Sequence, residues 1–166
     1  MLKEWTERPQ DVSNLLNPSF LGLLLYRAVH GFKRERSSGM PFELAVLVLP
    51  LVLHPATRNR LPAKVTTTLP TWVQANRDAL LEFPKRTKAL LPFTRESLCF
   101  LAERSLLLFD GEGRLDIGSQ KPLGVTQYQE ASEEIAACYK RAEFVGRWLA
   151  SAGSSATTYV LLGIRP

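Results

Sequence analysis

The sequence predicts a mainly α-helical domain with a winged-helix-like segment, that is, a helix-turn-helix followed by a β-hairpin. Capping residues and prolines divide residues 66–104 into short helices, which is typical of a helix-turn-helix. Residues 105–117 then read SLLLF, DGEG and RLDI, two apolar strands joined by a turn. Asp110-Gly111 favours this turn, because the dipeptide readily takes the positive φ angles that hairpins require.

Length and composition are typical of one globular domain. The chain has 166 residues, of which 45% are hydrophobic and 22% charged, enough to bury a sizeable core. The net charge of +5 permits nucleic acid or an acidic partner but requires neither. No apolar run approaches the roughly 20 residues of a membrane span, and residues 1–10 do not resemble a signal peptide. We therefore expect a cytoplasmic protein, with Cys99 and Cys138 as buried small hydrophobic residues in a reducing compartment.

Two apolar elements are expected near the N-terminus. Residues 19–34 predict a helix capped by Asn17 or Ser19, with an apolar first half and a basic second half. Residues 42–53 are almost continuously apolar, so periodicity alone allows either a central strand or a buried helix. Their length, and Pro50 within them, favour a helix.

The middle of the chain predicts three helices before the hairpin. The first runs from Thr66–Thr68 to Asn76. The second covers residues 77–91, is kinked or restarts at Pro84, and ends at Pro92. Thr94 would cap the third, over residues 95–104. In a winged helix this third helix would read DNA, and residues 110–114 would form the wing tip.

The C-terminal part predicts a long helix over residues 128–152 and a short one after Ser154 and Ser155, ended by Gly163. We expect residues 1–125 to form a helical core that includes the winged-helix-like segment, about 66–118, and residues 126–166 to pack on the same domain. The long helix carries a seam that would either pack within the protein or dock on a partner helix. The seam consists of Ala131, Ile135, Cys138, Ala142, Val145, Leu149 and Ala152.

Groups that carry chemistry are scarce. His30 and His54 are expected to be surface or capping residues, and the sequence has no zinc, phosphate-loop or nucleophile-elbow motif. We therefore expect no catalytic residues, no metal and no cofactor.

Basic residues form candidate phosphate contacts, although charged runs on helices are often only solvated faces. These candidates are Arg58, Arg60, Lys64, Lys85, Arg86, Lys88, Arg95 and Arg114.

The N-terminal segment offers a second candidate partner surface. Its apolar side chains lie outside any confidently predicted element and therefore need a cover. They are Trp5, Val12, Leu15 and Leu16.

Short blocks along nearly the whole chain resemble a known family. They are Trp5, Arg8-Pro9, NLLNPSFLGLLL, GMPFELAVLVLPLVLH, Thr57-Arg58 with Leu61-Pro62, Trp72, Pro92-Phe93-Thr94-Arg95-Glu96 and the terminal LLGIRP. Together they resemble the middle component of bacterial three-component ABC systems. None of the blocks is a catalytic motif.

The resemblance implies a small non-catalytic subunit. Its partners would be an ABC ATPase of the chromosome-maintenance or double-strand-repair type (SMC- or RecN-like) and a third, effector-like component encoded nearby. Such systems are thought to act on DNA in defence against phage or plasmids. The alternative is a free-standing winged-helix regulator. We favour the adaptor, because residues 95–104 hold as many glutamates as arginines and otherwise look more like core than a groove-reading helix.

Overall fold

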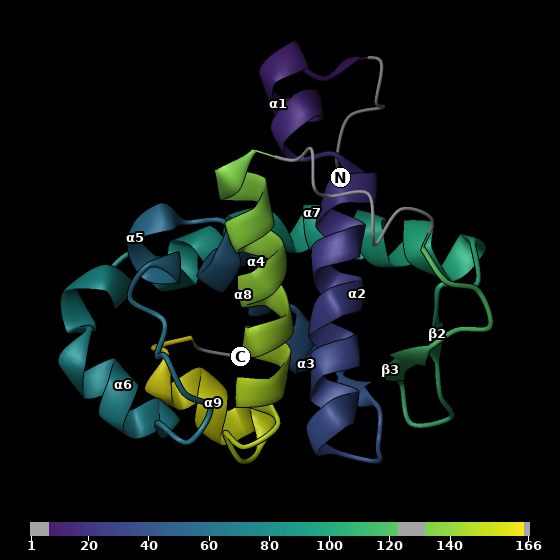
Figure 1. The fold of residues 1–166 in the computed structure, drawn as a ribbon. Helices are drawn as coiled ribbons and strands as arrows, with labels where there is room; N and C mark the ends of the chain where they lie inside the picture. The colour runs from purple at the N-terminus through teal and green to yellow at the C-terminus, as the bar shows by residue number, and fades with distance from the viewer. Residues whose placement is uncertain (1–6, 123–131, 165–166) are drawn as a thin grey trace.

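The computed structural model describes residues 7–122 and 132–164, and it confirms a mainly helical fold with a small sheet (Figure 1). The first half contains α1 (Gln10–Leu15), α2 (Pro18–Glu35), β1 (Met40–Pro41), α3 (Phe42–Ala45), α4 (Val48–Val52), α5 (Pro55–Arg58) and α6 (Leu69–Ala75). The second half contains the 3-10 helix η2 (Arg77–Leu80), α7 (Phe83–Glu103), β2 (Leu107–Phe109), β3 (Arg114–Ile117), α8 (Glu133–Leu149) and α9 (Ser155–Leu161).

Helices α2 and α8 form the centre of the molecule. They lie side by side and run in the same direction, with α7 crossing behind them (Figure 1). Helix α2 begins where the sequence predicts, since the Asn17 side chain accepts a hydrogen bond from the Ser19 amide at 2.8 Å. The apolar first half of α2 is buried, and Lys33 and Arg34 occupy its last turn.

The apolar run after α2 is helical, as predicted, but it forms two short helices. Residues 44–52 are all buried, which explains why they carry no charge. The chain breaks between α3 and α4 at Val46 and Leu47, and Pro50 lies inside α4. This segment fills the space beneath α2, α7 and α8 with aliphatic side chains.

The predicted helix boundary at Pro92 is wrong. Helix α7 is continuous over 21 residues with Pro92 inside it, and Thr94 is not a cap. Instead the Thr94 hydroxyl donates a hydrogen bond to the carbonyl of Leu90, one turn back, at 3.0 Å. Ser97 and Leu98, in the predicted recognition helix, face the core. The separate third helix is therefore missing, and the winged-helix detail is not confirmed.

The β-hairpin is confirmed, and β1 adds a third strand that the sequence did not predict. The sheet order is β1-β3-β2, and all pairs are antiparallel. The residue with positive φ in the turn is Gly113, not Gly111. A carboxylate oxygen of Asp110 accepts hydrogen bonds from the amides of Glu112 and Arg114, both at 2.9 Å, and closes the turn.

Helix α8 ends three residues before the predicted end at residue 152. Helix α8 begins after the cap Ser132 and ends at Leu149, and the predicted start at residues 128–131 lies outside the described residues. Helix α9 follows the cap Ser154, as expected. Within the described part of the chain, no helix is both long and apolar enough to cross a membrane.

Candidate functional site

A groove of about 600 Å³ opens between α1, the first turn of α2 and the first turn of α8. Its walls are mainly apolar, and Leu15 on its rim is 71% exposed. We call it the α1–α8 groove. It is lined by Asn14, Leu15, Leu16, Asn17, Phe20, Leu53, Arg58, Ser132, Glu134, Ile135 and Cys138. An exposed leucine beside an apolar hollow is typical of a protein-binding surface.

The groove unites residues that the sequence predicted as two separate partner surfaces. Leu15 and Leu16 come from the N-terminal segment, whereas Ile135 and Cys138 come from the seam of α8. Phe20 and Leu53 complete the walls. Sequence analysis missed them because nothing in a single helical pattern shows that the start of α2 and the end of α4 meet.

Three of the remaining seam residues lie in the protein's own core, and Ala152 is half-buried against it. Ala142, Val145 and Leu149 are 0% exposed and belong to the cluster that α2 also enters, so they present no surface to a partner. Trp5 and Ala131 lie outside the described residues, as does the side chain of Val12.

Arg58 forms one wall of the groove and is 5% exposed. Its Nη1 donates to the carbonyl of Val52 at 2.9 Å and lies 3.3 Å from the Cys138 sulfur, while its Nη2 donates to Glu134 at 3.1 Å. The guanidinium therefore ties the end of α4 to the start of α8 and satisfies a buried carbonyl. The burial of this side chain and its bonds within the protein disfavour the predicted role as a phosphate contact.

Arg86 is also held within the protein. Its Nη2 donates to the hydroxyl of Thr57 at 3.2 Å and to the carbonyl of Ala79 at 3.1 Å.

Nearby, His54 caps α5, because its Nδ1 accepts a hydrogen bond from the Thr57 amide at 3.3 Å. Burial, followed by the positive charges of Arg86 and Arg58, lowers the pKa of His54. A neutral ring suits this cap, because a protonated Nδ1 could not accept the amide hydrogen.

The other predicted phosphate contacts lie on the surface. Three are paired with carboxylates: Arg60 with Asp78 at 2.6 Å, Lys85 with Glu82 at 3.0 Å and Arg114 with Glu112 at 2.8 Å. Three others are exposed and form no ion pair with a described residue: Lys64, Lys88 and Arg95. Cys99 is exposed as well, contrary to the predicted burial, and only Cys138 is buried.

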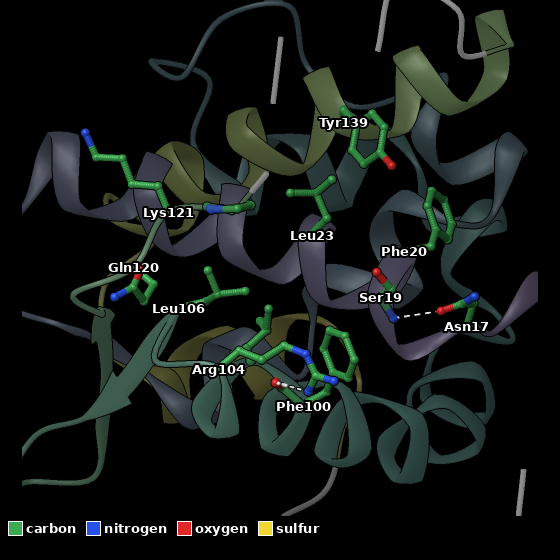
Figure 2. Close-up of a pocket in the computed structure, with 12 residues that line it drawn as sticks. Asn17, Ser19, Phe20, Leu23, Phe100, Arg104, Leu106, Gln120, Lys121 and Tyr139 are labelled. Carbon is green, nitrogen blue, oxygen red and sulfur yellow. Dashed lines mark hydrogen bonds between the residues drawn. The ribbon is translucent and has the colours of Figure 1, made fainter. Parts of the chain in front are cut away.

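A second hollow, of about 730 Å³, lies on the other side of the first turns of α2 (Figure 2). We call it the α2–α7 cavity. It is lined by Asn17, Ser19, Phe20, Leu23, Phe100, Leu101, Arg104, Leu106, Gln120, Lys121, Pro122 and Tyr139. In Figure 2, Leu23 lies centrally, Phe20 and Tyr139 lie on one side, and Arg104 and Phe100 form an edge. Phe20 thus lines both hollows.

Comparison with protein families agrees with the sequence blocks described above. The family described as ABC-three component (ABC-3C) system Middle Component 3 matches residues 5–166 of this chain. The chain belongs to this family. No curated protein and no solved structure matches it.

Family membership is consistent with an accessory subunit that associates with other components of an ABC system. In the described residues of this Middle Component 3 protein, no group of three or more His, Cys, Asp and Glu side chains is placed to hold a metal ion. Two hollows, the α1–α8 groove and the α2–α7 cavity, flank α2, and Phe20 lines both of them.

Proposed function

We propose that this Middle Component 3 protein is a non-catalytic adaptor that docks on an SMC- or RecN-like ABC ATPase through the α1–α8 groove. One observation carries the proposal. Two segments far apart in the sequence, the end of α1 and the start of α8, meet in one apolar groove whose rim residue Leu15 is 71% exposed. A complex that covers the groove would bury this side chain together with the apolar walls beside it.

The energetic effect of that burial is sufficient to matter. Covering a leucine side chain contributes about 1.5–3 kcal/mol. Central apolar anchors in protein interfaces typically cost about 2 kcal/mol or more when truncated. Because a stable interface covers about 800 Å² on each partner, the contact would extend beyond the groove to the surrounding surface.

A role on DNA, and in defence against phage or plasmids together with a third, effector-like component, is part of the same proposal. Of the predicted phosphate contacts, Lys64, Lys88 and Arg95 are exposed and form no ion pair with a described residue. They are few and scattered, so any DNA binding by this subunit would be weak, independent of sequence and sensitive to salt. A sequence-specific regulator is less well supported, because Ser97 and Leu98 point into the core.

Co-expression with the two proteins encoded beside this chain tests the adaptor proposal. We expect the ATPase to co-elute with it in size-exclusion chromatography, with or without nucleotide and DNA. We also expect that the isolated subunit neither hydrolyses ATP nor cuts DNA. If it elutes alone under all of these conditions, the adaptor proposal is wrong.

A further inference from the structure

We infer that the α2–α7 cavity is a second docking site, which accepts an acidic segment of a partner protein. The segment would place a large apolar side chain in the cavity and a carboxylate on Arg104. This inference rests on the proposed adaptor function, because it supposes a protein partner. It adds a second surface and the chemistry of what binds there.

Arg104 is arranged to receive a carboxylate. Its guanidinium carbon lies 3.7 Å from the centre of the Phe100 ring, and its Nη1 donates to the Phe100 carbonyl at 3.2 Å. These contacts fix the orientation of the guanidinium plane. Its Nε and Nη2 make no hydrogen bond with a described residue, and the side chain is 51% exposed. A guanidinium held in this way can bind a carboxylate through two parallel hydrogen bonds.

The charges around the cavity favour an acidic ligand. Its described lining contains Arg104 and Lys121 but no aspartate or glutamate. Lys121 extends outward at the rim, where it can reach a second acidic side chain (Figure 2). The nearest carboxylate, that of Glu103, lies 3.7 Å from Nη1, the nitrogen already bonded to Phe100, and is 75% exposed. An exposed pair of this kind offers little competition to an incoming ligand.

The apolar lining of the cavity favours a peptide over a nucleic acid. Leu23, Leu101 and Leu106 can cover an apolar side chain, and a volume of about 730 Å³ accommodates one readily. A nucleic-acid groove would instead need a row of cations that follows the phosphate backbone. The described lining of the cavity contains two cations, Arg104 and Lys121, which is too few for such a row.

Two substitutions test whether binding depends on this cavity or only on the net positive charge of the protein. Arg104→Gln removes the guanidinium. Ser19→Glu places a carboxylate in the wall of the cavity, where it would compete for Arg104, and a glutamate in the first turn of α2 is compatible with the helix. Arg95→Gln is the matched control. Arg95 is an exposed arginine of α7, the helix that ends at Arg104, and it does not line the cavity.

The probes are overlapping fluorescent peptides that cover the sequences of the two neighbouring proteins, titrated with the full chain and followed by anisotropy. We expect binding of at least one peptide in which Asp or Glu lies close to a large apolar residue. Arg104→Gln and Ser19→Glu should each weaken that binding about tenfold or more, and Arg95→Gln should change it less than about twofold. Circular dichroism of each variant checks that it is folded.

Three results would overturn the inference. No peptide binds, or Arg104→Gln and Ser19→Glu behave like Arg95→Gln, or the same two variants weaken binding of a labelled single-stranded DNA instead of a peptide. If the wild-type chain still co-elutes with the ATPase in any of these cases, only the second site is wrong. Failure of that co-elution would instead contradict the adaptor proposal itself.

Discussion

Gly146 of α8 lies directly against the main-chain carbonyl of Ala28 in α2, with no room for a Cβ atom between them. Gly31 of α2 is placed in the same way against the carbonyl of Glu143. The two central helices therefore touch backbone to backbone at their crossing. This close contact lies in the C-terminal half of α8, whose first turn lines the α1–α8 groove.

Gly146→Val should strongly destabilise the protein. The added side chain would force α2 and α8 apart, and over-packing of this kind costs about 3 kcal/mol or more when the obstacle is backbone. Urea unfolding followed by circular dichroism measures the loss. Gly111→Ala is the control, because nothing lies within 4 Å of a Cβ at that position and its φ is not positive. Equal stability of the two variants would contradict the close crossing.

Arg58→Met should lower the free energy of unfolding by about 2–4 kcal/mol, because it leaves the buried carbonyl of Val52 with only the long contact from the Cys138 thiol at 4.0 Å. Arg60→Gln should change it by less than about 1 kcal/mol, because the pair with Asp78 is exposed. Denaturant titrations of both variants give the comparison. A mild effect of Arg58→Met on stability, together with a reduced affinity for DNA, would instead support its predicted role as a phosphate contact.

Lowering the pH should reduce the free energy of unfolding, in part through protonation of His54. Because its pKa is lower in the folded state, the unfolded chain binds more protons once the pH falls below about 6.5. The contribution is complete above that pH and is lost as the pH falls through the folded-state pKa. His54→Asn keeps a capping side chain but does not titrate, so its free energy of unfolding should fall less between about pH 7.5 and 5. If the free energy of unfolding of the wild type and of His54→Asn fell equally over this pH range, His54 would not have this role.

The two cysteines should differ sharply in reactivity. Cys99 is exposed, whereas Cys138 is buried and burial raises the pKa of its thiol. Iodoacetamide should therefore modify Cys99 in the folded protein, and Cys138 only after denaturation. Peptide mass spectrometry distinguishes the two sites. Rapid modification of Cys138 in the folded state would show that the groove wall opens readily.

Local signals predicted several helix starts, since Asn17, Thr68 and Ser154 cap helices through their side chains, whereas the cap of α8 at Ser132 was not predicted. The end predicted at Pro92 failed for a tertiary reason. Phe83 and Thr87 before the proline, and Leu98 after it, are buried on one continuous face, and this packing outweighs the cost of a proline inside a helix.

The groove was predictable only in part. In the sequence, Leu15 and Leu16 are apolar residues outside any predicted helix or strand, which suggested that a partner covers them. Ile135 and Cys138 were predicted from the helical spacing of the seam. Their meeting depends on how α1 sits over α8, which no local pattern encodes. Charge alone did not show that Arg58 and Arg86 would donate to carbonyls within the protein, because a basic residue after an apolar run can either face solvent or bond to buried carbonyls.

The most direct test of the adaptor account is the affinity of the Leu15→Glu variant for the ATPase encoded beside this chain, compared with that of Val160→Glu. The two side chains are 71% and 73% exposed, but Val160 lies on α9, away from both hollows. Isothermal titration calorimetry on the full chains should show Leu15→Glu binding about 30-fold more weakly than wild type, which corresponds to about 2 kcal/mol, and Val160→Glu binding unchanged. Wild-type affinity for Leu15→Glu would contradict docking through the α1–α8 groove.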